Sequence, residues 1–135
     1  DLSKLKVAFY TQHTNGSAEA NTVATVHKVV KALADVCKVV EEKLPPRIEE
    51  IFPITKDYWN RLESTDVDEW KSEDANKLDG EAVAKHLFEW DRFRRSMLSF
   101  IKEWDVIITP AAELPALPHD ANGGSIDYTL AYSLT

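Results

Sequence analysis

The stretch LKVAFYTQHTNGSAEANTVATVHKVVKALADVCKVVEEKL, residues 5–44, decides the fold. It opens with an apolar run over 5–10, which is typical of a buried strand. An amphipathic pattern with apolar residues three and four apart then predicts a helix over 18–34. A second apolar run over 36–44 is stopped by a proline pair, which cannot continue a strand ladder. Together they predict a βαβ unit, in which a right-handed helical crossover joins two parallel strands.

The second half of the chain adds a long helix and a third strand. The longest helical pattern spans 81–103, and its apolar arc is wide enough to predict burial on more than one side. Three consecutive apolar residues at 106–108 suit a central parallel strand over 105–109, ended by a proline. The expected stripe on the long helix consists of Val83, Leu87, Trp90, Met97, Ile101 and Trp104, flanked by Phe88, Phe93, Leu98 and Phe100.

The connections between these elements are less patterned. Ser17 is the expected N-cap of the first helix, after a polar turn over 11–17. Two short helices broken near Pro53 are expected over 47–61, and the acidic stretch 63–80 predicts a solvated irregular connection or short helices. A loop over 111–127 precedes a short element over 128–134. The predicted fold class is α/β, a single domain or fragment with a three-stranded, mainly parallel sheet (5–10, 36–44 and 105–109) and two packed helices (18–34 and 81–103).

Composition narrows the function classes. The 135 residues hold 16 Lys and Arg against 23 Asp and Glu, a net charge of −7, which argues against nucleic acid as a partner. No apolar run approaches the roughly 18 residues of a membrane span, so no membrane partner is expected. The single cysteine, Cys37, fits a reducing compartment and predicts a cytoplasmic protein.

Most familiar catalytic patterns are missing. The first turn holds one glycine, so neither a dinucleotide site nor a P-loop is indicated. The histidines lack metal-ligand spacing, and His86 is expected on a helix surface. Cys37 is interpreted as a small core residue of the second strand. Gly123-Gly124-Ser125 lacks the strand and helix of a hydrolase elbow and is better read as a flexible turn. No metal, cofactor or catalytic residue is predicted within the chain.

The chain also begins at Asp1, and it ends at Leu134-Thr135 inside a patterned segment, with Met97 as its only methionine. This pattern is typical of an excised piece of a longer protein.

An ordered series of segments carries a family resemblance. LKVAFY (5–10) and SAE (17–19) are followed by CKVVEEKLP (37–45). RRSMLSFIKEWDVIITPA (94–111) then leads through LPALPH (114–119) to YTLAYSLT (128–135). In this order the chain resembles the C-terminal part of an amidase signature family enzyme, whose fold is a larger α/β/α arrangement.

The resemblance implies hydrolysis of amide C–N bonds by a Ser–Ser–Lys arrangement in the intact enzyme. Those catalytic residues belong to the N-terminal half of the family, so none is carried over and the chain alone is expected to be inactive. What transfers is the wall of the pocket for a small-molecule amide substrate, formed by Thr109, Pro110 and Tyr128. Ser133 stands where the family commonly has asparagine, which leaves the role of that position in doubt.

Two alternatives stay open beside the amidase fragment. One is a stand-alone α/β binding or regulatory module, and the other is an independent hydrolase that uses Ser125. Because a partial sheet leaves strand edges and apolar helix faces uncovered, we also expect a homo-oligomer that associates through them.

Overall fold

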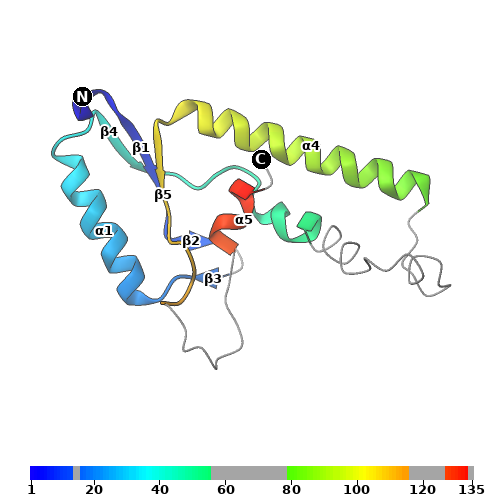
Figure 1. Cartoon of the computed structure of the whole chain (residues 1–135), viewed down its shortest axis with the longest axis horizontal. Helices are drawn as coiled ribbons and strands as arrows, with labels where there is room; N and C mark the ends of the chain where they lie inside the picture. The colour runs from blue at the N-terminus through cyan, green and yellow to red at the C-terminus, as the bar shows by residue number, and fades with distance from the viewer. Residues whose placement is uncertain (14–15, 56–78, 116–126, 134–135) are drawn as a thin grey trace.

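The computed structural model describes residues 1–13, 16–55, 79–115 and 127–133. Its centre is a three-stranded sheet in the order β4-β1-β5, made of β1 (Lys6–Phe9), β4 (Val39–Glu42) and β5 (Val106–Ile108). β1 pairs in parallel with both neighbours, with Val7 opposite Val40 on one side and opposite Val106 on the other. The predicted α/β fold class, with a small parallel sheet and packed helices, is therefore confirmed (Figure 1).

The position of β5 differs from the prediction. β1 is the central strand, with Val7, Ala8 and Phe9 all buried, whereas β5 lies at an edge of the described sheet. Val106, at the start of β5, is 37% exposed. The apolar run at 106–108 suggested a strand covered on both faces, but hydrophobic composition alone does not distinguish a central strand from an apolar edge.

Helix α1 (Ala20–Ala34) provides the crossover and covers one face of the sheet (Figure 1). Its buried Val26 and Val30 pack on Phe9 of β1, with Val40 and Ile108 beside them. This agrees with the apolar stripe predicted from the sequence. Because alternate strand residues point to opposite faces, Tyr10 and Ile107 lie on the other face.

The start of α1 was predicted wrongly. Ser17 belongs to β3 (Gly16–Ser17), which pairs antiparallel with β2 (Gln12–His13), and Glu19 is the N-cap without a side-chain cap bond. The Glu19 amide instead donates to the carbonyl oxygen of Glu113, at 2.7 Å. The small hairpin thus takes up residues that the sequence favours as a simple turn, the N-cap position moves to Glu19, and a distant loop binds the amide of that residue.

Two further elements differ from the prediction, the second strand and the helical segment around Pro53. β4 begins at Val39, so Cys37 lies half-buried in the turn after α1 and not in a strand. The 3-10 helix η2 (Ile48–Glu50) runs directly into helical residues 51–55, which include Pro53. The proline does not break this segment, because the first residues of a helix have no intrahelical acceptor for their amides. The remainder of the predicted pair of helices, the connection over 63–78 and most of the loop over 111–127 lie outside the described residues.

Helix α4 (Gly80–Glu103) packs one face against η2 and the segment after it. The hydrophobic cluster at this contact joins Phe93 and Met97 of α4 to Leu130 and Ala131 of the short helix α5 (Asp127–Ser133). Its other buried members are Ile48, Ile51 and Ile54. A 3-10 turn, η1 (Leu2–Lys4), precedes β1.

The prediction that α4 is buried on more than one side is wrong. Leu87 is 59% and Phe88 66% exposed, while Phe93 is fully buried. At about 100° per residue, Leu87 and Phe88 lie about 120° and about 140° around the helix from Phe93, so they leave the packed face. The buried positions follow the single stripe His86, Phe93, Met97 and Phe100.

This difference in burial predicts that replacing phenylalanine with alanine has a large effect at one position of α4 and a small effect at the other. Phe93→Ala should lower the free energy of unfolding by about 3–5 kcal/mol, because it opens a cavity in the core. Phe88→Ala should change it by about 0.5 kcal/mol or less. Urea denaturation of both variants measures the two values, and equal losses would contradict the assigned face of α4.

Candidate functional site

The three residues predicted to line a pocket lie near the carboxyl ends of β1 and β5. Thr109 follows β5 directly, Pro110 is buried beside it, and Tyr128 lies on α5 with no exposed surface. Tyr10, which follows β1, connects them. Its ring stacks against Tyr128 at a centroid distance of 6.2 Å, and its hydroxyl lies beside that of Thr109.

Tyr128 joins parts of the chain that are far apart in sequence. Its hydroxyl donates to the carbonyl oxygen of Thr11 at 2.7 Å and accepts from the amide of Ala18 at 2.9 Å. The rings of His13 and Tyr128 meet edge to face, with their centroids 5.8 Å apart. Because both functions of this hydroxyl are used by the backbone, Tyr128 holds the wall of the site in place.

Tyr10 also contacts a second tyrosine of α5, Tyr132. The hydroxyl oxygens of Tyr10 and Tyr132 are 3.1 Å apart. Burial raises the pKa of Tyr10, against the smaller lowering effect of the hydroxyls of Tyr132 and Thr109. Burial, together with Tyr10, raises the pKa of Tyr132 well above its usual value. Both phenols keep their protons at neutral pH, so they can donate hydrogen bonds but cannot act as general bases.

Sequence reasoning missed Tyr10 and Tyr132 as members of this site. A signal was available for Tyr132, because it stands four residues after Tyr128 and therefore falls on the same face of a helix. No comparable signal existed for Tyr10, since the last residue of a predicted strand can point to either face until the register is known.

A hollow of about 270 Å³ opens beside this cluster, along β5. Two polar atoms near it, Nε1 of Trp104 and Oγ1 of Thr109, are buried and have no hydrogen bond of ordinary geometry within the described residues. Its lining consists of Ile101, Trp104, Asp105, Ile107, Thr109 and Tyr132. Mostly apolar walls with a few hydroxyl and indole donors fit a wall of a binding pocket better than a catalytic centre.

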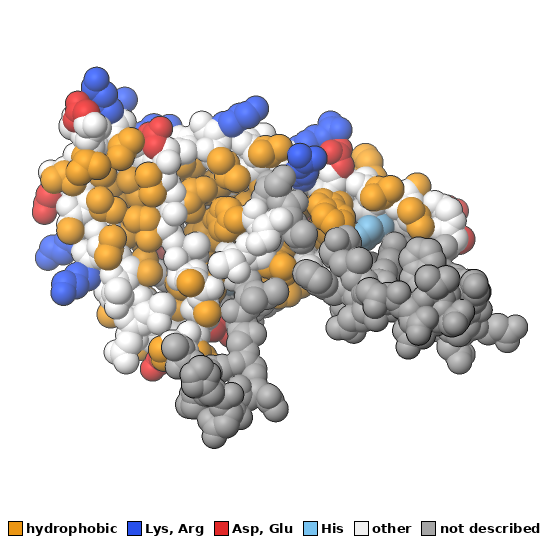
Figure 2. Space-filling model, in the orientation of Figure 1, with side chains coloured by type: hydrophobic (Ala, Val, Ile, Leu, Met, Phe, Trp, Pro, Cys, Tyr) orange, Lys and Arg blue, Asp and Glu red, His pale blue; other side chains and the backbone are white. Residues whose placement is uncertain are grey.

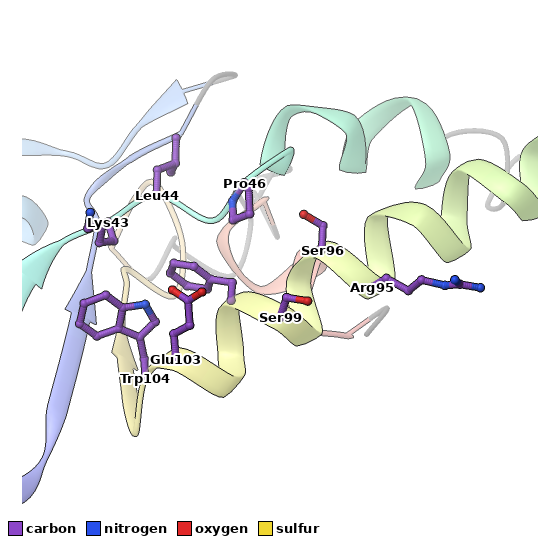
Figure 3. A pocket seen from close by; sticks show the side chains of 9 residues that line it. Lys43, Leu44, Pro46, Arg95, Ser96, Ser99, Glu103 and Trp104 are labelled. Carbon is purple, nitrogen blue, oxygen red and sulfur yellow. The ribbon is translucent and has the colours of Figure 1, made fainter.

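A larger hollow of about 430 Å³ lies on the other side of Trp104, between α4 and the chain after β4 (Figure 3). Arg95 points away from it and pairs with Asp91 at 2.6 Å. Its other lining residues are Lys43, Leu44, Pro46, Ser96, Ser99, Phe100, Glu103 and Trp104. These mixed charges and hydroxyls do not converge on one point in the way a nucleophile and its base would.

The remaining candidates are scattered. His86 is 7% exposed and its ring meets that of Trp90 edge to face, with centroids 5.9 Å apart, so its expected place on the helix surface is wrong. His27 is exposed, with its ring against Phe9. His119 and Ser125 lie outside the described residues. Within the described ranges, no three histidine, cysteine or acidic side chains are grouped as metal ligands would be.

Comparison with known proteins adds no family assignment: no protein-family model matches the chain, and no curated protein matches it. In the part of the chain that is described, no helix combines the length and apolar character needed to cross a bilayer.

The hydrogen bonds of Tyr128 predict a large effect from removing one atom. Tyr128→Phe should lower the free energy of unfolding by at least about 2 kcal/mol, because two buried backbone groups each lose a partner at a cost of about 1–3 kcal/mol. Tyr132→Phe, the matched control on the same helix, removes one partly buried contact and should cost about 0.5–1.5 kcal/mol. Urea unfolding with near-ultraviolet circular dichroism gives both values, and a reversed order would contradict the role assigned to Tyr128.

The raised pKa values of Tyr10 and Tyr132 predict alkaline sensitivity. Their usual value is 10.0, so in the unfolded chain they lose protons near that pH, whereas in the folded chain they keep them. Stability from this source is fully present below about pH 10 and falls as the pH rises above it. Unfolding free energies measured from pH 8 to 11 should therefore decline at the alkaline end, and less steeply in Tyr132→Phe. An identical decline in that variant would exclude Tyr132 as a source.

Proposed function

We propose that the chain is the C-terminal part of an amidase, which supplies one wall of the substrate pocket and requires a companion half for hydrolysis. The observation that carries the proposal is the place of Thr109 and Pro110, at the carboxyl end of β5 and beside Tyr10 of β1. Ligands of open α/β sheets bind outside the carboxyl ends of the strands. Of the segments that carry the resemblance to the amidase signature family, those at 5–10, 37–45, 94–111 and 128–133 contain β1, β4, the end of α4 with β5, and most of α5, and the segment at 17–19 leads into α1.

The chemistry divides between the two halves. Hydrolysis of an amide needs a nucleophile to add to the carbonyl carbon, a donor to protonate the departing amine, and water to release the acid. The phenols clustered here hold their protons and act as positioning groups. The companion half brings the Ser–Ser–Lys arrangement, while this chain provides shape and hydrogen-bond donors for a small neutral amide. No cofactor is required, and the proposed location is the cytoplasm.

A stand-alone binding module is the second candidate. The observation in its favour is the 270 Å³ hollow, which this chain forms from its own β5, α4 and α5. Such a module would bind a small molecule unaided and would gain nothing from a companion half.

The amidase proposal is tested in the longer protein to which the chain belongs. Thr109→Val, which keeps the shape and removes the hydroxyl, and Pro110→Ala should each raise KM for amide substrates several-fold, because they alter the pocket wall. Steady-state kinetics with several amides measures the effect. Phe88→Ala, on the exposed face of α4, is the control and should leave KM unchanged.

Unchanged KM in both pocket variants across all amides would contradict the proposed wall. The chain by itself should show no amidase turnover. Turnover by the isolated chain that disappears in Ser125→Ala would replace the proposal with an independent hydrolase.

A further inference from the structure

The hollow between α4 and the chain after β4 combines apolar walls with charges of both signs. On the face of the molecule in Figure 2, hydrophobic side chains occupy the middle, and most Lys and Arg side chains lie around the rim. In the hollow the two kinds meet. Leu44, Phe100 and Trp104 supply apolar walls, while Lys43 enters from the chain after β4 and Glu103 from the end of α4 (Figure 3). Its volume of about 430 Å³ lies within the range of small-molecule pockets, roughly 300–1,000 Å³.

Glu103 occupies a place that disfavours an acid. It is the last residue of the 24-residue helix α4, whose final carbonyl groups give that end a partial negative charge. Lys102 of the same turn offsets part of this charge but does not line the hollow. Within the described ranges, no basic side chain forms an ion pair with Glu103. A cation that entered the hollow would therefore be attracted both by the carboxylate and by the end of the helix.

Two serines of α4 border the hollow beside this carboxylate. Ser96 and Ser99 are three residues apart, and Glu103 follows four residues later, so the three side chains share one face of the helix. Serine is a poorer helix former than alanine or leucine. Ser133 of α5 donates back to the carbonyl oxygen of Thr129 at 3.1 Å, whereas neither serine of the hollow has such a bond within the described residues. Their hydroxyls therefore keep hydrogen-bonding capacity for a ligand.

Lys43 brings the opposite charge to the other wall. Its backbone is held in place, because its amide donates to the carbonyl oxygen of Phe9 at 2.9 Å. Its ammonium lies 3.9 Å from the Glu41 carboxylate, at the limit of an ion pair, and about half of each side chain is exposed. An ammonium carries three donors, so Lys43 can bind a further anionic group.

We propose that this hollow binds a compact zwitterion of the amino-acid type. The ammonium of the ligand lies at Glu103 and the end of α4, where the serine hydroxyls can accept its hydrogen bonds, and its carboxylate lies at Lys43. An apolar side chain on the ligand packs between Leu44 and Phe100. The hollow thereby selects for both charges, because a ligand with a carboxylate alone leaves Glu103 without a partner and a ligand with an ammonium alone is repelled by Lys43.

This inference goes beyond the proposed function and does not rest on it. The hollow lies on the other side of Trp104 from the proposed wall of the amide pocket, and Thr109 and Pro110 do not line it. Since the described residues form it without a companion half, the chain as it stands should bind the ligand.

Three matched probes test the need for both charges. Leucine is a zwitterion, leucinamide carries only the ammonium, and 4-methylpentanoate carries only the carboxylate. Isothermal titration calorimetry on the 135-residue chain at about pH 6, where the amines are protonated, gives the three dissociation constants. Leucine should bind about threefold or more tightly than either analogue, as expected for one exposed ion pair. Equal binding of the three probes, or no binding of leucine at about 10 mM, overturns the proposal.

Charge-removing variants test where the ligand binds. Lys43→Met and Glu103→Gln should each weaken leucine binding about threefold. Lys43→Met should also abolish the preference for leucine over leucinamide, and Glu103→Gln the preference for leucine over 4-methylpentanoate. Arg95→Met is the matched control, because it removes the same charge as Lys43→Met from a side chain that points away from the hollow, and it should leave all three constants unchanged (Figure 3).

The replaced side chains are all exposed, so the variants should stay folded, which circular dichroism verifies. If both preferences persist in the variants, the zwitterion binds elsewhere and the proposal is overturned. The comparison of the three probes on the unmodified chain decides the ligand class even if a variant unfolds. Neither measurement depends on amide hydrolysis, so a failed amidase proposal would leave these outcomes unaffected.

Discussion

The double pairing of β1 is the constraint on which the rest of the structure depends. Lys6–Phe9 forms a ladder with β4 on one side and β5 on the other, so four residues bring together segments from both ends of the chain. The strand has a buried residue at three of its four positions. Its side chains serve both faces, since Phe9 meets α1 while neighbouring Tyr10 meets α5. Any shift in its register would exchange these two faces.

The tyrosine cluster follows from that register. Because Tyr10 leaves β1 on the face opposite α1, it meets Tyr128 and Tyr132 of α5 and the hydroxyl of Thr109. Tyr128 then fixes the backbone at Thr11 and Ala18, the two ends of the hairpin segment. The candidate site is consequently a set of hydroxyl groups whose positions are fixed by contacts between segments far apart in the sequence.

The sequence predicts well those features that local periodicity controls. The valine stripe of α1 and the apolar runs of the three strands were sufficient to place the parallel sheet and its crossover. Prediction from the sequence fails for features that are determined by contacts between distant segments. Ser17 is a good N-cap by type, yet it pairs with Gln12 in the hairpin, and the helix begins after Glu19, whose amide donates to a carbonyl of the loop after β5. Leu87 and Phe88 belong to the apolar pattern of α4, but only tertiary packing determines which arc of a wide stripe is covered.

The same limit applies to the site. The position of Thr109 and Pro110 could be predicted because they end a recognisable strand, whereas their place in a pocket wall is what the family resemblance implies. The partnership between Tyr10 and Tyr132 depends on the register of β1 and on the approach of α5, which no local pattern contains. His86 shows the reverse error, because a polar residue on a helix was expected in solvent and is instead buried.

Trp104 lies where α4 ends and β5 begins, so its fluorescence depends on the contact between β5 and β1. The ammonium of Lys6 sits 5.3 Å from the centre of its indole ring, and Asp105 next to it is bonded to the backbone of the same lysine. Separation of β5 from β1 would remove that cation from the ring and admit solvent to the indole. Trp90, beside the core of η2, would sense a different event. Once the other three tryptophans of the chain are replaced by phenylalanine, the emission of Trp104 should therefore report whether β5 is joined to β1.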